Sequence, residues 1–350
     1  MSVALRIEDK DFKHYGIQNG PAEVWEDGQR LDHNNFKPGE YEWWYADGHL
    51  DDGGFFSFTY QVEADKDGNP FAFILINFAD KDGVVLSTRV EVDIKDVKIK
   101  KDFCDVQFGK HYIKSLDGLN KYEIYLDANE IEGGNGIHII LDKTVPTFRP
   151  GTGYWDANGL YFAWLCTVPS ATISGEMTLR GKSTAVTGNG YHDHNWGNSP
   201  MNTVLEDWYW SRAEVDGICV VTSSVRFKEE HGGLETKFAY LAKDNEVLIN
   251  AVNDDVVFLE GEKVAHPESG KKISSDCMYI VKNDSGEYNY IRFQGGDIVA
   301  TFPFGEDDEW ETYYARYISE TILDLKINGE HFKGEAHSTL ESMDFKSRRK

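Results

Sequence analysis

Hydrophobic and polar residues alternate with a period of two along most of the chain. Short runs rich in Val, Ile, Phe, Tyr and Thr are separated by turn signals such as Asp52-Gly-Gly, Lys81-Asp-Gly and Asp216-Gly. Successive side chains of a strand point to opposite faces, so this pattern is typical of antiparallel strands joined by hairpins. No stretch of about a dozen residues shows the period of an amphipathic helix. The sequence therefore predicts an all-β protein.

The alternating runs define roughly eight strands in each half of the sequence, enough to close a small barrel or sandwich around one ligand-sized cavity. In the first half we expect strands at 55–62, 71–78, 84–92, 122–127, 137–141, 161–168 and 171–179. In the second half we expect them at 208–215, 218–227, 236–241, 256–259, 278–281, 288–294, 297–304, 313–327 and 332–340.

A cluster of Gly, Asn, Ser and Pro at 188–202 marks the place where the two halves meet. The predicted organisation is a lead-in at 1–35, an N-terminal β domain at 36–190, a junction at 191–205 and a C-terminal β domain at 206–350. Ligand sites often lie in clefts between domains. We therefore expect the main cavity at the junction, bounded by Trp43 or Trp44, His194, Trp196, Trp208 and Trp210.

Residues able to transfer protons or stabilise charge are densest between 188 and 210. In an extended strand, Tyr191, Asp193 and Asn195 share one face. The other face carries His192, His194 and Trp196. Asp193 and the two histidines therefore cannot line one pocket unless a bulge or turn at Gly190 or Gly197 re-aims one of them.

The pair His192 and His194 is open to three interpretations. Two histidines on one strand face occur in metal sites, but an ion needs further ligands. The candidates are His49, Asp193, Glu206, His337 and Glu341, and none stands at a spacing that compels the choice. The pair could instead be hydrogen-bonded structurally in a buried junction, or act in acid–base chemistry without a metal. We favour the last interpretation, with no metal and no cofactor.

Asp193 is the carboxyl group of greatest chemical interest in this stretch. Burial among Trp196, Trp208 and Trp210 would disfavour its charged form, and a protonated carboxyl can donate to a carbon–carbon double bond. The alternative is that Asp193 orients a neighbouring histidine or caps a turn. The predicted catalytic residues are Asp193, His192 and His194, and the sequence leaves open which of them donates the proton.

Aromatic residues flank this stretch in both halves of the chain. A cavity with such walls would suit an apolar unsaturated substrate, and cation–π attraction would favour a carbocation over the neutral ground state. Such residues are otherwise usual in a hydrophobic core. The predicted substrate-binding residues are Trp43, Trp44, Tyr45, His49, Trp196, Trp208, Tyr209 and Trp210.

The formal charge of −24 excludes a basic surface for nucleic acid or anionic membranes. No signal-peptide pattern and no apolar run of about 18 residues occurs, so we expect a cytoplasmic protein without stable membrane insertion. The four cysteines are spread singly, which favours free thiols. The expected partner is a hydrophobic small molecule, and the chain is expected to be a monomer or a homodimer.

Several common catalytic motifs are missing from the sequence. It contains no phosphate-binding G-x-x-x-x-G-K-[ST], no dinucleotide-binding glycine fingerprint between a strand and a helix, and no G-x-S-x-G elbow. Phosphoryl transfer, hydride transfer and serine hydrolysis therefore have no support in the sequence.

Three segments together resemble one known superfamily. They are E-W-W-Y-A-D-G-H-L at 42–50, G-Y-H-D-H-N-W-G at 190–197 and D-W-Y-W-S-R at 207–212. Their order and spacing are similar to those of the hydroxyneurosporene synthase (carotenoid 1,2-hydratase)/AttH-like superfamily, which also includes kievitone hydratase and fungal decalin-forming Diels-Alderases. The resemblance extends from about Tyr41 to Phe345 and implies two lipocalin-like or calycin-like β domains. It implies the fold more strongly than one chemistry.

Residues and resemblance together predict a cofactor-independent hydratase or cyclase. Such a lyase would protonate an alkene of an apolar polyunsaturated natural product, a terpenoid, carotenoid or polyketide, and stabilise the cation in an aromatic pocket. One alternative is a Diels-Alderase-type pericyclase or isomerase of secondary metabolism. A second alternative is a non-catalytic lipocalin-like carrier of a hydrophobic ligand.

Overall fold

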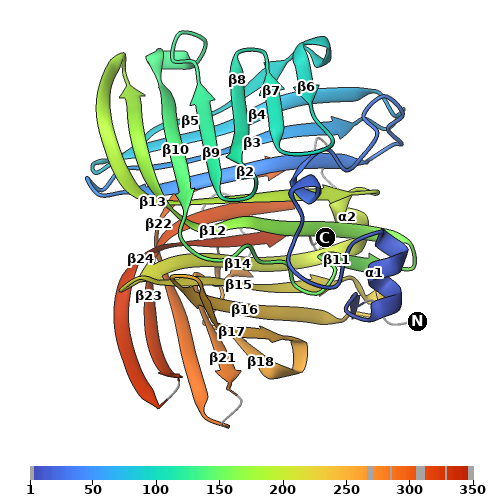
Figure 1. Cartoon of the computed structure of the whole chain (residues 1–350), viewed down its shortest axis with the longest axis vertical. Helices are drawn as coiled ribbons and strands as arrows, with labels where there is room; N and C mark the ends of the chain where they lie inside the picture. Colours follow the sequence, from blue (N-terminus) through green and yellow to red (C-terminus); the bar gives the residue numbers. More distant parts are fainter. Residues whose placement is uncertain (1–3, 266–271, 284–285, 305–311, 328, 346–350) are drawn as a thin grey trace. The chain divides into compact units, whose positions relative to one another are not determined.

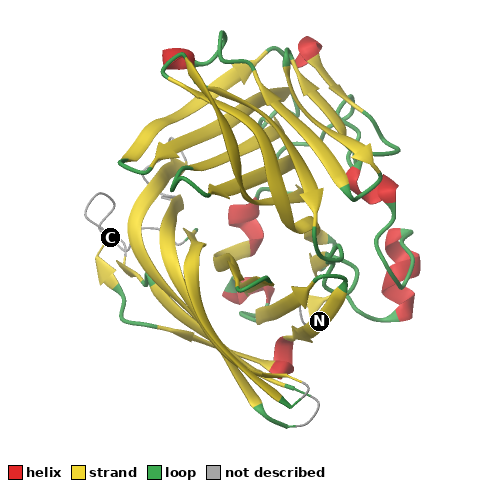
Figure 2. Cartoon of the chain, turned by 60° about the vertical axis from the view of Figure 1, so that its left-hand side comes forward, coloured by secondary structure: helices red, strands yellow, loops and turns green. Residues whose placement is uncertain are grey.

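The structure, a computed structural model, describes residues 4–265, 272–283, 286–304, 312–327 and 329–345. Within these ranges nearly all regular structure is β-strand (Figure 1 and Figure 2). The α-helices of the described chain are α1 (Asp9–Tyr15) and α2 (Met201–Val204). The predicted all-β class is therefore confirmed. No helix in the described ranges is long and apolar enough to span a bilayer.

The chain divides into two compact units, Leu5–Met201 and Asn202–Lys350. Each unit is built around its own antiparallel, barrel-like sheet. This agrees with the expectation of two β domains of lipocalin-like type.

The sheet of the N-terminal unit has thirteen strands among the described residues. Eleven of them follow the order β5-β4-β3-β2-β13-β12-β10-β9-β8-β7-β6, while β11 pairs with β12 and with β1. The strands are β1 (Ala4–Leu5), β2 (Tyr41–Leu50), β3 (Phe55–Ala64), β4 (Pro70–Asp80), β5 (Gly83–Val92), β6 (Val97–Ile99), β7 (Asp105–Phe108), β8 (His111–Asp117), β9 (Lys121–Leu126), β10 (Gly136–Lys143), β11 (Tyr154–Ala157), β12 (Leu160–Leu179) and β13 (Lys182–Gly197). Three 3₁₀ turns complete the unit: η1 (Val24–Asp27), η2 (Ile94–Asp96) and η3 (Glu132–Gly134).

Alternate residues of the N-terminal strands build one hydrophobic core. In β3, Phe56, Phe58 and Tyr60 point inward and are at most 1% exposed. They pack with inward residues of β4, β9 and β10. Aromatic and β-branched residues suit this half-buried pleated surface, which explains why period-two patterning located these strands.

The sheet of the C-terminal unit has nine strands among the described residues, in the order β17-β16-β15-β14-β24-β23-β22-β21-β18. They are β14 (Leu205–Val215), β15 (Ile218–Phe227), β16 (Glu235–Lys243), β17 (Glu246–Val252), β18 (Val256–Glu260), β21 (Asp276–Lys282), β22 (Tyr288–Phe304), β23 (Thr312–Ile327) and β24 (Glu330–Asp344). The same part of the chain contains a separate two-stranded sheet, formed by β19 (Val264–Ala265) and β20 (Lys272–Ile273). It also contains the 3₁₀ turns η4 (Glu229–His231) and η5 (Asn253–Asp255).

The strand predictions differ from the structure in two ways. The breaks predicted near residues 169 and 295 lie inside single long strands, β12 and β22, where register shifts interrupt the alternation without ending the strand. Several strands were not predicted, among them β6, β7, β8, β11 and β17. In β6, β7 and β8, lysine and aspartate residues interrupt the apolar positions.

All four cysteines are free and buried. This confirms the expectation of free thiols.

Candidate functional site

Strand β13 presents two chemically different faces at the centre of the N-terminal sheet. Its pairing with β2 is regular from Gly188 to Gly197, with His194 opposite Trp44 and Asp193 opposite Tyr45. Directly paired residues share a face, so the predicted alternation is confirmed. The described ladder with β2 has no bulge or turn at Gly190 or Gly197 that would bring these groups into one pocket, and Asp193 therefore lies on the face opposite to both histidines.

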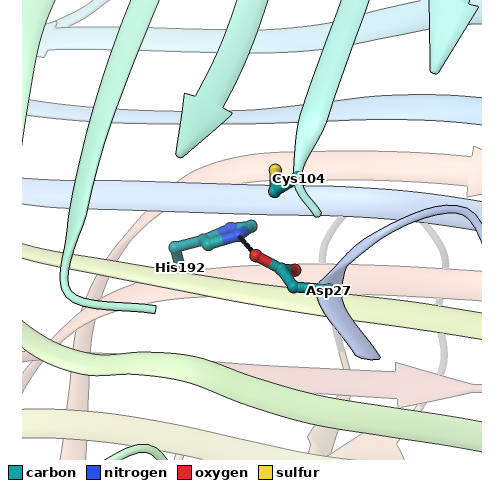
Figure 3. Close-up of side chains that lie close together, drawn as sticks. All are labelled: Asp27, Cys104 and His192. Atoms are coloured by element: carbon teal, nitrogen blue, oxygen red, sulfur yellow. Dashed lines mark hydrogen bonds and ion pairs between the residues drawn. The ribbon is translucent and has the colours of Figure 1, made fainter. Parts of the chain in front are cut away.

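His192 lies on the core-facing side and is fully buried. Its Nδ1 contacts the carbonyl oxygen of Tyr45 at 2.8 Å, and its Nε2 contacts Asp27 Oδ2 at 3.2 Å. Asp27 is the last residue of η1 and also accepts a hydrogen bond from the hydroxyl of Tyr122 at 2.6 Å. Figure 3 shows the His192 ring pointing from β13 toward Asp27, with Cys104 beside them.

His194 lies on the same side and is also fully buried. Its Nδ1 contacts the carbonyl oxygen of Glu26 at 3.2 Å, and its Nε2 contacts Glu42 Oε1 at 2.9 Å. Glu42 further accepts hydrogen bonds from the backbone amides of Arg30 and Leu31, at 2.6 and 3.1 Å. We call Asp27, Glu42, His192 and His194 the histidine–carboxylate cluster.

Both nitrogens of each histidine face oxygen acceptors. A backbone carbonyl can only accept, so both Nδ1 atoms carry hydrogen. The Nε2 atom of each histidine faces a carboxyl oxygen, and a second proton lies between these two atoms. Each histidine and its carboxyl partner therefore share a buried proton.

The charges of the cluster stabilise one another. Burial acts to raise the pKa of Asp27 and of Glu42, but their hydrogen bonds and attraction to the nearby histidines outweigh it. The pKa of Glu42 is lowered from 4.5 to about 2, and that of Asp27 is lowered as well. Burial acts to lower the pKa of His192, but Asp27 outweighs it and the pKa is raised. These shifts favour carboxylates paired with a charged His192.

Asp193 lies on the other face of β13 and is 5% exposed. Its Oδ2 accepts hydrogen bonds from the indole Nε1 of Trp164 at 2.8 Å and from the hydroxyl of Tyr191 at 2.7 Å. Its Oδ1 accepts from the amide of Asn195 at 2.7 Å. Three donors from β12 and β13 thus fix the orientation of this carboxyl group.

Aromatic rings surround the Asp193 face. Trp164 lies 6.4 Å from Trp155 and 5.8 Å from Phe148, measured between ring centroids. The Tyr45 and Tyr191 rings lie 5.9 Å apart, and the Tyr45 hydroxyl donates to Asp47 at 2.5 Å. A carboxyl group among electron-rich rings can serve a reaction in which positive charge develops on a substrate.

The predicted binding residues of β2 and β13 separate onto the two faces. Trp43, Tyr45 and His49 share the face of Asp193, with His49 opposite Asn189 in the ladder. Trp44 and Trp196 share the face of the histidines. Trp196 therefore lies on the opposite face of β13 from Asp193, although the sequence analysis expected it to surround that carboxyl group.

The predicted binding residues of β14 also divide between two faces. Tyr209 belongs to the core of the C-terminal unit, and its hydroxyl accepts a hydrogen bond from the Ser274 amide at 3.2 Å. Trp208 and Trp210 point to the opposite face of the strand, as the alternation predicted. Their roles in binding stay predictions, as does the expected cavity at the junction.

One group of potential metal ligands occurs among the described residues, formed by Asp27, Cys104 and His192. Their ligand atoms lie within 4.8 Å of one another, and all three side chains are buried. Burial, followed by the charge of Asp27, raises the pKa of the Cys104 thiol well above its ordinary value. An ion would have to displace that proton and the hydrogen bond between His192 and Asp27. The donors present therefore fit a proton-sharing cluster better than a metal centre.

Sequence reasoning missed several members of these two groups. Asp27 and Tyr122 complete the contacts of His192, and Trp164 and Tyr191 complete those of Asp193. Only Tyr191 lay within the stretch that the sequence singled out. No local pattern marks Asp27, which is 165 residues from His192 along the chain.

Two comparisons of the sequence with known proteins match parts of this chain. A family described as Diels-Alderase-like matches residues 120–267. The quinolone epoxide rearrangement protein AsqO of Emericella nidulans is 23% identical over 121 residues, which are 34% of this chain and 32% of that protein. The chain thus matches about a third of the length of this curated relative.

Solved structures share the fold over nearly the whole chain. An AttH protein from Nitrosomonas europaea superposes with a TM-score of 0.63 at 15% identity, covering 94% of this chain and 99% of that one. CghA with Sch210972 gives 0.65 at 15% identity, covering 93% and 96%. Kievitone hydratase from Nectria haematococca gives 0.56 at 13% identity, also covering 93% and 96%. At these identities the solved structures show that the fold is shared, and it is the two-domain β fold that the resemblance in the sequence implied.

Proposed function

We propose that this chain is a cofactor-independent enzyme that hydrates, cyclises or rearranges an apolar polyunsaturated natural product, with Asp193 as the proton donor. The substrate class is a terpenoid, carotenoid or polyketide. The observation that carries the proposal is the buried Asp193 carboxyl, oriented by Trp164, Tyr191 and Asn195 within an aromatic surrounding. The relatives named as a rearrangement protein and a hydratase support the reaction class.

In the proposed reaction, Asp193 acts in its protonated form, which has to form against three donors that favour the carboxylate, and transfers its hydrogen to one carbon of a double bond. The electron pair of that bond forms the new carbon–hydrogen bond, and the neighbouring carbon becomes cationic. The faces of nearby rings such as Trp164 and Tyr45 attract this cation more than the neutral alkene, which lowers the barrier. Water, or a nucleophile within the substrate, then adds to the cation. The proton released by that addition returns to the Asp193 carboxylate.

The geometry assigns the two histidines a different task from Asp193 in this proposal. Both nitrogens of His192 and of His194 are held by acceptors on the core-facing side. A substrate against the Asp193 face would not reach them. Of the three predicted catalytic residues, we therefore retain Asp193 as the group that touches the substrate.

The test is turnover in deuterated water with a panel of lycopene, farnesol and geranylgeraniol, followed by mass spectrometry of the products. The proposal predicts a product with one solvent-derived deuterium on carbon, formed by the wild type and lost in Asp193→Asn. Asp127→Asn is a matched control, because Asp127 is a buried carboxylate bonded to Asn129 at 2.8 Å in the same unit. Product formation by Asp193→Asn at the wild-type rate would overturn the proposal. Binding of a polyene by the wild type without conversion would favour the carrier alternative.

A pericyclic reaction is the second candidate, favoured by the Diels-Alderase-like match at 120–267. In that case the site would fold the substrate and activate it with a hydrogen bond, without transferring a proton to carbon. A linear polyene carrying a diene and a dienophile would cyclise. The product would then contain no deuterium on carbon from the solvent.

A further inference from the structure

The residues on either side of Asp193 are anchored on the opposite face of β13. His192 and His194 each bind one backbone carbonyl and one carboxyl on the core-facing side. The carboxyl groups come from two separate places, Asp27 in η1 and Glu42 in β2. Asp193 is thus flanked by two buried anchors that point away from it.

The ladder on the other side of β13 is irregular at this position. Along β12, His194 pairs with Leu165 and His192 pairs with Val168, so two residues of β12 oppose Asp193. A second register shift follows before Gly190 pairs with Ala171, so two residues also oppose Tyr191. These are β-bulges, which interrupt regular pairing and re-aim side chains. One of the bulged residues is Pro169, which has no amide hydrogen to give to the ladder.

The histidine–carboxylate cluster can hold the β13 backbone where the bulges weaken its pairing with β12. At a bulge the neighbouring strand holds the backbone of β13 less regularly, and a small rotation there would swing the Asp193 carboxyl away from its donors. The imidazole rings resist that rotation, because each is held at both nitrogens by buried partners. Asp27 is in turn held by Tyr122, and Glu42 by the amides of Arg30 and Leu31.

We propose that Asp27 and Glu42 are positioning residues for Asp193, acting through His192 and His194 to set the direction of a carboxyl on the opposite face of β13. This inference rests on the proposed function, because positioning Asp193 affects catalysis only if Asp193 is the proton donor. Neither carboxylate would touch the substrate. Their effect would be on the geometry of the proton donor.

The Trp164 indole provides a reporter that needs no substrate, because its Nε1 hydrogen bonds to Asp193 Oδ2. In a ¹⁵N–¹H spectrum the nine tryptophans give nine indole cross-peaks at most, and Trp164→Phe identifies the one of interest. Asp27→Asn and Glu42→Gln keep the shape of each side chain but remove its charge. We expect both variants to shift the Trp164 cross-peak, and to change its pH profile, more than Asp127→Asn does.

An unshifted Trp164 cross-peak with an unaltered pH profile, in a variant with a native circular dichroism spectrum, would overturn the proposal. The two carboxylates lie in different elements, so failure of one variant to fold leaves the other to decide. The result is also separable from the proposed function. If Asp193→Asn still transfers deuterium, the catalytic assignment fails whatever the spectrum shows. If Asp193→Asn is inactive but the cross-peak does not respond to Asp27→Asn or Glu42→Gln, only the positioning role fails.

Discussion

Trp44 and His194 lie directly opposite each other on β2 and β13, and their rings stack with centroids 4.4 Å apart and planes 13° from parallel. The Trp44 indole also donates a hydrogen bond to the backbone oxygen of Asp27 at 3.0 Å. One side chain therefore supports a histidine of the cluster and the turn that supplies its carboxylate. Stacking of the two rings adds a directional aromatic contact to the packing.

Replacing Trp44 should separate these two contributions. Trp44→Ala removes a fully buried ring and should lower the free energy of unfolding by about 3–5 kcal/mol. Trp44→Phe keeps a ring over His194 and loses chiefly the hydrogen bond, which is worth about 1 kcal/mol. Urea unfolding followed by circular dichroism measures both. Equal losses for the two variants would show that ring stacking contributes nothing.

The cluster should give the protein a particular dependence of stability on pH. The lowered pKa of Glu42 contributes stability that is present above 4.5 and is lost as the pH falls through about 2. The raised pKa of His192 contributes stability that is present below 6.5 and is lost as the pH rises through its folded value. For these groups, stability is therefore greatest between about pH 4.5 and 6.5.

Glu42→Gln should flatten the acid side of this profile. For the wild type, the shift of Glu42 corresponds to about 3 kcal/mol that disappears between pH 5 and pH 2. The free energies of unfolding of wild type and variant should therefore converge as the pH is lowered. A constant difference across this range would contradict the assigned role of the Glu42 charge.

A buried ion pair holds η1 against the loop before β11. The Arg149 guanidinium contacts the Glu26 carboxylate, and both side chains are only 4% exposed. Glu26→Ala would leave the buried guanidinium without this carboxylate and should cost about 3–5 kcal/mol. The exposed pair Lys81–Asp82 supplies the control, because solvent screens this contact and Asp82→Ala should have little effect on stability. Similar costs for the two variants in urea unfolding would contradict this account.

Two glycines make room for the core beneath the site. Gly190 and Gly48 face each other in the ladder, and a Cβ on Gly190 would lie 2.6 Å from Leu141 Cδ2 and 3.0 Å from Ile173 Cγ1. Gly190→Ala should therefore cost about 1–3 kcal/mol through overpacking. Gly20→Ala should have little effect, since nothing lies within 4 Å of a Cβ there. Thermal unfolding of the two variants compares them, and a lower melting temperature for Gly20→Ala than for Gly190→Ala would reverse the expectation.

The fold was predictable because strand periodicity is a local property of sequence. The alternation of Tyr191 to Trp196 between two faces followed from the same rule and is confirmed by the ladder with β2. The partners of these residues were not predictable, because contacts such as Asp27 with His192 join distant segments. Pairing across a sheet depends on topology, and no spacing in the sequence encodes it.

The sequence pattern also did not predict where the register shifts between β12 and β13 occur. A bulge or turn at Gly190 or Gly197 was the condition for Asp193 and the histidines to line one pocket, yet the register shifts occur in β12, opposite Tyr191 and Asp193. Gly190 is needed for space rather than for a change of direction. Pro169 lies between the strands predicted at 161–168 and 171–179, where the structure has a bulge inside β12 and not the end of a strand.

The contacts between η1 and β13 also set an order of events during synthesis. Asp27 is made 165 residues before His192, and Glu26 is made 168 residues before His194. At about 5–20 residues per second, a ribosome needs on the order of ten seconds or more to cover that distance. Throughout that time the carboxylates of the turn have no histidines to bind, while the early hairpins β2–β3 and β4–β5 can already pair. Docking of the turn onto β13 therefore cannot begin until β13 has been synthesised, after the early hairpins have had time to form.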